Sequence, residues 1–491
     1  MPRVVLVKLE SGPRPPTPSP PFALLFLATA LERAGYEVRL HHRWIETKAE
    51  TARLTDELLA DHPLFVGFST LSGPGLIHAL EASLGLRAVS RVPIVWGGLH
   101  PTLLLDQVLA EPCVDVAVHG EGEETVVELA DSFHRAGSGR PNLGGIAGIA
   151  FTDSGRIVVN PPRPFIRNLD PYPPAWPCLE TAPYFSKAGL APPGGRIASI
   201  LTSRGCPGRC AFCSNTTVNR GTFRALSVRA VLDQVRELRK SHGICGLNIL
   251  DDQFFGDLAR AGEIARNLGL PWKSSARVYD IVRWGDDVLA ELGASGCSEF
   301  RIGAESGSQR LLERLRMDIT REDIVRAAER CGRHGIRARF SFMIGLPGET
   351  EADRRMTYDL MDRLEDMGGL IAVDGPFVYF PWPGTSLYRE ALRLGYKPPS
   401  RTRDWGWGNR PPRPAFTPRR LRSVEHYSRM RRQNREDSPH VPVFLKGLGV
   451  LARVRWRRRA FRLPLDYYLP RAAVALLRRF KFRITAGLDE H

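Results

Sequence analysis

Three cysteines, Cys206, Cys210 and Cys213, stand within a stretch of eight residues. The strand-like run 197–202 leads into them, and glycines and a proline within 205–208 forbid regular structure around them. Thiolates on a short irregular loop can all point at one centre, which is how iron–sulfur clusters are held. Ordinary clusters of this kind take four thiolates, whereas this loop offers three. The spacing therefore predicts a cluster with one open iron, which can bind a small molecule and act as a reagent.

A structural zinc site and disulfide bonds are the competing interpretations of these cysteines. A structural zinc site requires a fourth Cys or His ligand at short spacing, and none follows within the next turn. The sequence shows no secretory signal, so we expect a reducing, cytoplasmic compartment in which thiols stay reduced. The other cysteines are scattered singly, and we expect them to be buried or inert: Cys113, Cys178, Cys245, Cys297 and Cys331.

The CxxxCxxC pattern, with the aromatic Phe212 before the last cysteine, resembles the signature of the radical SAM superfamily. The resemblance implies that the three cysteines ligate a 4Fe–4S cluster, whose open iron binds the amino and carboxylate groups of S-adenosylmethionine. The reduced cluster then cleaves the sulfonium of S-adenosylmethionine to give a 5′-deoxyadenosyl radical. The resemblance also implies that Phe212 lies beside the cofactors. An external low-potential donor of the flavodoxin or ferredoxin type would supply the electron.

Strands and helices alternate along residues 1–137. The expected strands are 3–9, 36–42, 64–70, 92–98 and 114–120, and the expected helices lie near 22–34, 51–60, 76–88, 103–110 and 123–135. Five strands separated by helices predict an α/β fold with a doubly wound parallel sheet. The apolar stretch 20–38 follows a predicted strand and becomes amphipathic, so we expect a buried first helix rather than a signal peptide.

Ligands on doubly wound sheets bind at the carboxyl ends of the strands. Three of these ends carry glycines and polar residues: Ser69, Thr70, Gly97, Gly98, Gly120, Glu121 and Gly122. Glycine there lets the backbone approach a flat or anionic ligand closely. Taken alone, the pattern predicts a Rossmann-like domain, and a structural role without a ligand stays open.

The segments GFSTLSGP, WGGLHPT and VHGEGEET resemble the cobalamin-binding domain that is fused to many radical SAM enzymes. The resemblance implies that the strand ends named above bind cobalamin. The familiar fingerprint of that domain places a cobalt-ligating histidine after the first strand, whereas the loop from Lys8 to Pro20 contains no histidine. If cobalamin binds, its lower face lacks that ligand, as in many relatives. His100 and His119 are the nearest alternatives, and we expect each of them in a turn or a hydrogen bond.

Residues 138–196 change in composition and are predicted to link two domains. A hairpin-like run at 146–159 precedes a proline-rich run at 163–177. Proline joins neither central strands nor helix interiors, so we expect an extended strap.

The strand–helix alternation resumes over residues 197–395. The expected strands are 197–203, 246–252, 271–277, 299–305, 337–345 and 375–381. Six such units match the open, partial (β/α)6 TIM-like barrel of the radical SAM fold, whose site is assembled at the carboxyl ends of the strands.

Polar residues and a glycine-bearing loop cluster at these carboxyl ends. Asp251 and Asp252 close the second strand, Glu305 and Ser306 close the fourth, and Ile344–Gly345 follow the fifth. By resemblance, Glu305 and its neighbour Ser306 lie near the ribose hydroxyls of S-adenosylmethionine, where a carboxylate can accept two hydrogen bonds. The two aspartates lie where the family contacts the methionine amine or the substrate, and the backbone at Ile344–Gly345 would cradle the adenine. Each carboxylate taken singly could instead be a strand cap.

The net charge of +16 lies entirely in the C-terminal part of the chain. Residues 401–491 hold 23 Lys and Arg against 7 Asp and Glu, so residues 1–400 are neutral. We expect residues 396–491 to be basic and mainly helical, with aromatics at Trp456, Phe461, Tyr467 and Phe480. A helical cover over the barrel, a segment lying on an anionic membrane and an RNA-binding surface are the three interpretations. We favour the cover and place the membrane surface second and RNA third, because no RNA-binding module is recognisable. No apolar run approaches the ~18 residues of a membrane span.

The combined resemblance predicts a cobalamin-dependent radical SAM enzyme. Its commonest chemistry is methylation of an unactivated carbon, or phosphorus, in a small-molecule or natural-product substrate. An oxidative cyclase resembling the anaerobic magnesium-protoporphyrin monomethyl ester cyclase is the alternative. A tRNA methylthiotransferase would carry three further cysteines near its N-terminus, whereas residues 1–112 contain none. A non-catalytic sensor would not need the polar groups at the barrel ends. The substrate itself is not readable from the sequence.

Overall fold

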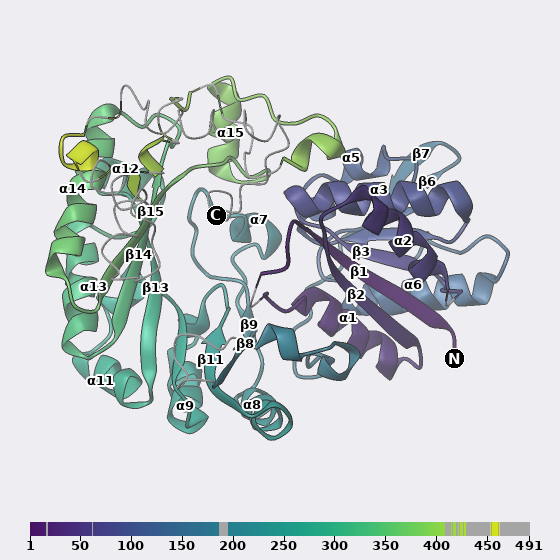
Figure 1. Ribbon diagram of the computed structural model, residues 1–491, viewed down its shortest axis with the longest axis horizontal. Helices are drawn as coiled ribbons and strands as arrows, with labels where there is room; N and C mark the ends of the chain where they lie inside the picture. The colour runs from purple at the N-terminus through teal and green to yellow at the C-terminus, as the bar shows by residue number, and fades with distance from the viewer. Residues whose placement is uncertain are drawn as a thin grey trace, which may run out of the picture.

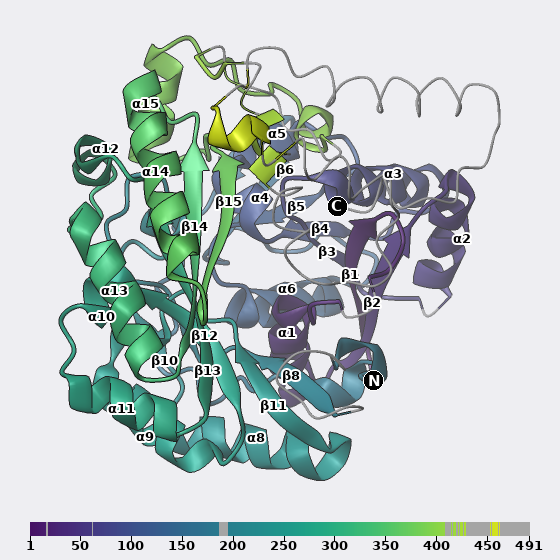
Figure 2. The same cartoon turned by 60° about the vertical axis from the view of Figure 1, so that its left-hand side comes forward.

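The computed structural model describes residues 1–15, 18–60, 62–185 and 195–407, together with parts of 414–428 and 452–461. It contains two large sheets that lie side by side, one from the N-terminal part of the chain and one from the central part (Figures 1 and 2). Among the described helices, none is long and apolar enough to cross a membrane.

The N-terminal sheet has seven strands in the order β2-β1-β3-β4-β5-β6-β7. Its strands are β1 Arg3–Ser11, β2 Glu37–Ile45, β3 Val66–Ser69, β4 Ile94–Gly97, β5 Val116–Val118, β6 Ile149–Asp153 and β7 Arg156–Val159. The first five strands are parallel, and helices pack on both faces in two separate apolar cores. Because β1 is buried on both faces, its sequence is a nearly continuous apolar run. The predicted doubly wound sheet is confirmed.

The helices of this domain are α1 Phe22–Arg33, α2 Lys48–Leu59, α3 Pro74–Val89, α4 Leu99–Leu103, α5 Leu105–Leu109 and α6 Glu123–Ala136. Helix α1 serves both domains, because Leu24 and Leu31 lie in the N-terminal core while Leu25 and Phe26 lie in the core of the barrel. A helix that is apolar on most sides is buried on most sides. The shared position of α1 explains its composition and confirms that it is a buried helix.

The hairpin that the sequence places in the linker belongs to the N-terminal sheet. β6 pairs antiparallel with β5, and β7 pairs antiparallel with β6. The three-residue β5 would otherwise expose an unpaired edge, which sheets avoid by adding a strand or a cover. Ile149 and Ala150 are fully buried by this pairing. The sheet therefore extends to Val159, beyond the boundary expected at residue 137.

The central sheet has six parallel strands in chain order, which confirms the partial barrel. Its strands are β8 Arg196–Ile200, β11 Ile244–Ile249, β12 Trp272–Arg277, β13 Cys297–Glu305, β14 Arg337–Ile344 and β15 Ile371–Val378. The last strand begins four residues before the expected Gly375, because the polar Asp374 and the Gly-Pro pair that follows it hide the strand pattern. A short ribbon of β9 Ser203–Arg204 and β10 Arg224–Ala225 lies beside β8.

Helices cover the outer face of the barrel and leave its inner face turned toward the N-terminal domain (Figure 1). The main ones are α8 Val228–His242, α9 Leu258–Leu268, α11 Asp286–Ala294, α13 Arg321–Arg333 and α14 Glu351–Met367. Shorter helices are α7 Asn215–Val218, α10 Val278–Ile281, α12 Gln309–Arg314 and α15 Ser386–Arg393. Along β12, β13 and β14, buried positions alternate with half-buried ones. The buried set joins the apolar core beneath the helices, so the half-buried set faces the inside of the barrel.

Part of the basic C-terminal region packs on the barrel. Trp456 and Phe461 are buried against Tyr358 of α14, and the Trp456 indole N–H donates to Asp362 Oδ1 at 2.7 Å. These two aromatics fit the predicted helical cover and are not available to a membrane. Tyr467 and Phe480 lie outside the described residues.

Replacing Trp456 with alanine removes a buried side chain and its hydrogen bond. We expect the free energy of unfolding to fall by about 3–5 kcal/mol. Val454 stands in the same helical turn but is 43% exposed, so Val454→Ala should cost less than about 0.5 kcal/mol. Urea denaturation of the two full-length variants compares them. Equal losses would show that Trp456 does not pack on α14 as described.

Candidate active site

The cysteine loop leaves the barrel sheet after β8 and the β9 strand. Gly205 has a φ of +85°, and a Cβ there would lie 2.0 Å from the carbonyl oxygen of Thr222, so only glycine fits this turn. Cys206, Cys210 and Cys213 are all half-buried around the loop that follows. The Cys213 N–H donates to the carbonyl of Cys210 at 3.2 Å, which closes the end of the loop.

Burial raises the pKa of all three thiols and brings that of Cys210 to about 12. Thiols in such surroundings become thiolates only when a nearby positive charge compensates for their burial, and bound iron supplies that charge. The described residues hold no group of three His, Cys, Asp or Glu side chains close enough for a single metal ion. A four-iron cluster needs no such convergence, because its ligands bind different irons. The donor set therefore fits the predicted cluster.

The far side of the cysteine loop is tied to the segment after α12 and to α15. The Ala211 N–H donates to the carbonyl of Leu315, and the Leu387 N–H donates to the carbonyl of Ala211. Phe212 is half-buried and packs on an apolar cluster that includes Leu346 and Tyr379. The aromatic of the motif thus anchors the loop as well as standing beside the cysteines.

The two adjacent aspartates at the end of β11 have different surroundings. Asp251 is buried and accepts hydrogen bonds from the Thr202 N–H, the Thr202 hydroxyl and the Ser203 hydroxyl, each at 2.6 Å. Both of its oxygens are occupied, so Asp251 positions the chain that enters the cysteine loop. Asp252 is exposed, accepts the Gly205 N–H at 3.1 Å and lines the cavity between the domains. Asp252 is therefore the aspartate open to a ligand.

Glu305 ends β13 in a backbone conformation that is uncommon outside glycine, with a φ of +63°. Its carboxylate folds back over Gly303, where a Cβ would lie 2.4 Å from Glu305 Oε1. Burial raises the pKa of Glu305 to about 8, and the described residues supply no hydrogen-bond donor to this carboxylate. Ser306 instead exchanges a hydrogen bond with Thr357 at 3.2 Å and accepts the Ser308 N–H at 3.1 Å. Glu305 is thus open to a ligand, whereas Ser306 holds the turn.

The backbone at Ile344–Gly345 has its own partners inside the protein. The Ile344 carbonyl accepts the Tyr379 N–H at 2.8 Å, and Glu349 accepts the Gly345 N–H at 2.7 Å. A Cβ at Gly345 would lie 3.0 Å from the Thr417 methyl group. The expected cradle for adenine therefore offers packing surface here rather than free hydrogen-bonding groups.

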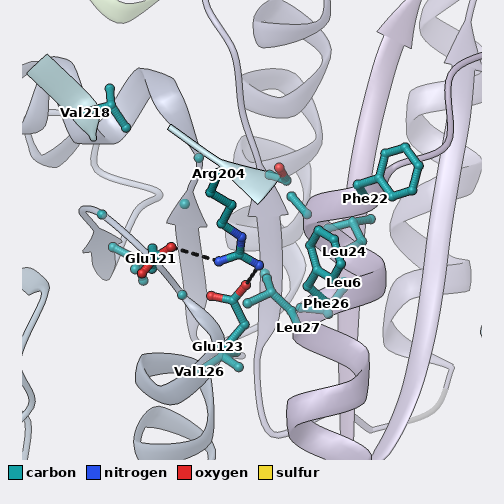
Figure 3. A pocket seen from close by; sticks show the side chains of 18 of the residues that line it. Leu6, Phe22, Leu24, Phe26, Leu27, Glu121, Glu123, Val126, Arg204 and Val218 are labelled. Carbon is teal, nitrogen blue, oxygen red and sulfur yellow. Dashed lines mark hydrogen bonds and ion pairs between the residues drawn. The ribbon is translucent and has the colours of Figure 1, made fainter. Parts of the chain in front are cut away.

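The strand ends of the N-terminal sheet meet the cysteine-loop side of the barrel at one cavity of about 390 Å³ (Figure 3). Six of the seven residues expected at these ends line it: Ser69, Gly97, Gly98, Gly120, Glu121 and Gly122. Thr70 does not, because it is buried and its hydroxyl donates to the Gly97 carbonyl at 3.2 Å. Leu24, Phe26 and Phe68 supply apolar walls, and Ser203, Arg204 and Asp252 enter from the barrel. The cavity thus offers glycine edges and apolar walls, which suit a flat organic cofactor.

The histidines nearest this edge are used within the protein. Nδ1 of His100 lies 2.8 Å from the Ser72 hydroxyl, and its ring meets Trp405 edge-on. Burial lowers the pKa of His100 to about 4. Neither His100 nor His119 lines the cavity. The expectation that His100 belongs to a hydrogen bond is confirmed.

A buried ion-pair network that sequence analysis missed joins the two domains at the cavity (Figure 3). Arg204, two residues before Cys206, donates to Glu121 at 2.9 Å and to Glu123 at 2.5 Å. Arg224 donates to the same Glu121 carboxylate at 2.6 Å. Burial would raise the pKa of Glu121, but the two arginines outweigh burial and hold that pKa below its ordinary value. The alternating acids of GEGEE and the arginine before the motif are the sequence signals for this network.

Arg277 is a second residue that the sequence did not single out. It ends β12, and its guanidinium carbon lies 3.7 Å from where a Cβ on Gly208 would stand. Its charge opposes the rise in pKa that burial imposes on Cys206 and Cys210. A cation therefore stands directly beside the cysteine loop.

Two family profiles match this chain in the segments that form the two sheets. Residues 200–361 match the Radical SAM superfamily, and residues 15–130 match the B12 binding domain. PH0819 of Pyrococcus horikoshii, an uncharacterized methyltransferase, is 30% identical over 385 residues, which cover 77% of this chain and 79% of that protein. The chain belongs to the radical SAM enzymes with an N-terminal B12-binding domain.

Two further relatives of this radical SAM enzyme are named for an activity. The anaerobic magnesium-protoporphyrin IX monomethyl ester cyclase of Rubrivivax gelatinosus is 28% identical over 387 residues, covering 76% of this chain and 66% of that protein. The radical S-adenosylmethionine methyltransferase TsrM of Kitasatospora setae, solved with cobalamin and a 4Fe–4S cluster bound, shares the fold with a TM-score of 0.63. Its sequence is 22% identical, and the match covers 80% of this chain and 78% of TsrM.

Replacing Arg204 with glutamine leaves the buried Glu123 without its ion-pair partner and leaves Glu121 with Arg224 alone. Breaking a buried ion pair from one side costs about 3–5 kcal/mol of unfolding free energy, so we expect a loss of that size. Adding Glu123→Gln should restore part of the loss, because it removes one orphaned charge. The exposed pair of Arg140 and Asp153 gives the control, and Arg140→Gln should leave stability nearly unchanged. Urea denaturation measures all four proteins, and equal effects of the two arginine changes would contradict the network.

The raised pKa of Glu305 predicts a pH-dependent penalty in the protein without cofactors. The folded state keeps the proton up to about pH 8, whereas the unfolded chain releases it near the ordinary pKa of about 4.5. Wild-type stability should therefore fall as pH rises from 4.5 to 8, and Glu305→Gln should not share this loss. The difference in melting temperature should widen between pH 5 and pH 8. The exposed Glu313 serves as the control, and a flat difference for Glu305→Gln would contradict its burial.

Proposed function

We propose that this radical SAM enzyme methylates an unactivated carbon or phosphorus of a small-molecule substrate, with cobalamin as the methyl carrier. The observation that carries the proposal is the single cavity between the glycine-bearing strand ends and the cysteine-loop side of the barrel. A cofactor at the strand ends would face the reagents held by the loop. PH0819 and TsrM, both methyltransferases by name, support this chemistry.

Each side of the site has a defined role in the proposal. Cys206, Cys210 and Cys213 would hold the cluster, while Asp252 and Glu305 would meet S-adenosylmethionine. The protonated Glu305 needs a partner, and the ribose hydroxyls can donate to it and accept from it. Bound together, the cluster and S-adenosylmethionine supply a radical that removes a hydrogen atom, and cobalamin supplies the methyl group.

The strand ends that line the cavity would hold the corrin ring against the apolar walls. The loop from Lys8 to Pro20 has no histidine, and His100 is engaged with Ser72. The lower face of cobalt would therefore have no protein nitrogen ligand.

The proposal includes two partners, an electron donor and a membrane surface. The cysteines outside the loop are scattered singly, so the sequence offers no second cysteine motif. An external low-potential donor of the flavodoxin or ferredoxin type would therefore reduce the cluster.

Residues 462–491 carry an excess of Lys and Arg, which supports contact with an anionic membrane surface.

An oxidative cyclase is the second candidate. The observation that favours it is the Rubrivivax gelatinosus cyclase, which matches nearly the same share of this chain as PH0819 does. A cyclase of this type would form a ring without transferring a methyl group.

Anaerobic reconstitution tests the proposal. We expect about four irons per chain, and none in the variant with all three loop cysteines changed to alanine. Added cob(II)alamin should bind and show no nitrogen splitting in electron paramagnetic resonance. With reductant and S-adenosylmethionine, the enzyme should release 5′-deoxyadenosine and S-adenosylhomocysteine.

The products separate the candidates. Both products together support methyl transfer, whereas 5′-deoxyadenosine without S-adenosylhomocysteine favours the cyclase. Release of neither product, or retention of a full cluster in the cysteine variant, would overturn the proposal.

A further inference from the structure

The inner face of the barrel carries a layer of charged side chains on adjacent strands. In the register of the sheet, Lys273 of β12 stands beside Glu299 of β13. Two residues further along, Arg301 of β13 stands beside Arg339 of β14. All four are half-buried, on the face opposite the helices, which turns toward the N-terminal domain (Figure 1). TIM-like barrels usually fill this face with branched apolar side chains. A charged layer here therefore suggests a function other than packing.

Arg301 and Arg339 are direct neighbours on one face, and like charges in that position destabilise a sheet. Arg339 is compensated, because its guanidinium lies 3.4 Å from both Glu299 Oε2 and Asp374 Oδ1. The Arg339 side chain is also 36% exposed, so part of its charge remains open to a ligand.

Arg301 makes no ion pair with a described residue, although Glu299 is near enough to favour its charge. It donates only to neutral acceptors, at 2.7 Å to Asn248 Oδ1 and at 3.4 Å to the carbonyl of Ile249. Its Nε–H is buried and has no hydrogen-bond partner among the described residues. Burial lowers the pKa of Arg301, the nearby charge of Glu299 opposes this, and the neighbouring Arg339 adds to it. A half-buried guanidinium with an unused N–H is a group that an anion would stabilise.

Lys273 adds a third cation to the layer. Within the described part of the chain it makes no ion pair and no hydrogen bond, although Glu299 is near enough to favour its charge. Burial lowers its pKa, and both Arg301 and Arg339 act in the same direction. The three cations are therefore close enough to repel one another, and among them only Arg339 makes ion pairs with described carboxylates.

The positions between this layer and the cysteine loop are occupied by small residues. Gly303 and Ser341 face each other across β13 and β14, and Ser275 stands beside Arg301. Four residues of strand separate Arg301 from Glu305, which is roughly 13 Å at about 3.3 Å per residue. A small molecule held at the cations would therefore extend toward Glu305 and the loop.

We infer that Lys273 and Arg301, with Arg339 beside them, bind an anionic group of the substrate on the inner face of the barrel. The group is a phosphate, phosphonate or carboxylate, and it anchors the end of the substrate that does not react. This inference rests on the proposed function for the site but names a substrate class that the function leaves open. The carboxylate of S-adenosylmethionine has the same chemistry and is the competing source.

Binding of simple probes to the full-length, reconstituted enzyme tests the inference. Phenylphosphonate and benzoate carry the anion, and benzamide is their neutral counterpart. In isothermal titration with S-adenosylmethionine and cobalamin present, we expect the anionic probes to bind and benzamide not to bind. Arg301→Gln and Lys273→Gln should each weaken phenylphosphonate at least tenfold, and Arg301→Lys should recover part of the loss. Arg196 is exposed at the start of β8, and Arg196→Gln should change nothing.

Several results would overturn the inference. They are no binding of either anion at 10 mM, equal binding by the glutamine variants, or equal binding of benzamide. A tenfold loss of S-adenosylmethionine affinity in the variants would assign the cations to the cofactor instead. Melting curves show whether each variant is folded, and Arg301→Lys keeps the test open if a glutamine variant is not.

The same preparations separate this inference from the proposed function. Wild-type enzyme should cleave S-adenosylmethionine to 5′-deoxyadenosine under reducing conditions without any probe. If cleavage fails, the proposed function fails. If cleavage persists while anions do not bind, only the anion site is wrong.

Discussion

One buried salt-bridge network holds the N-terminal domain and the barrel of this enzyme together. Arg204 reaches from the start of the cysteine loop to Glu121 and Glu123 on the last parallel strand end of the N-terminal domain. Burying these charges is costly, and they are stable only while every partner is in place. Movement of either domain would therefore leave a largely buried charge without its partner. The network makes the distance between the two halves of the site a fixed property of the fold.

The same reasoning explains how the cysteine loop keeps its shape without regular structure. Asp251 holds its entry through three hydrogen bonds, and the backbone of Ala211 ties its far side to residues before and after the last strands. The loop is thus supported from the β11 end and from the β15 end of the barrel. Residues that sequence patterns would place on a ligand, such as Asp251 and Ser306, serve this support instead. The groups left open, Asp252 and Glu305, are those that a cofactor can use.

Side chains along the barrel strands alternate between the apolar core beneath the helices and the inner face of the barrel. Residues such as Phe300 and Phe340 face the helices and are fully buried, while their neighbours Arg301 and Arg339 face inward. A packed apolar core on one side stabilises the sheet, so the other side is free to carry polar groups that no folding requirement demands. Glu305 and Arg301 both lie on that inner side with burial opposing their charge. A ligand with a complementary group would stabilise such side chains, as in a binding site.

The sequence by itself determined the cysteine motif, the α/β fold with two parallel sheets and most strand positions, because these follow from local spacing and alternation. It could not assign the hairpin at 149–159, since an edge strand has the same pattern in a linker as in a sheet. It could not tell Asp251 from Asp252. Which of two adjacent side chains is buried and which faces the cavity depends on the segments that pack against the end of the strand. The contacts of Arg204 with Glu121 and Glu123 span more than 80 residues, so only the tertiary structure decided them.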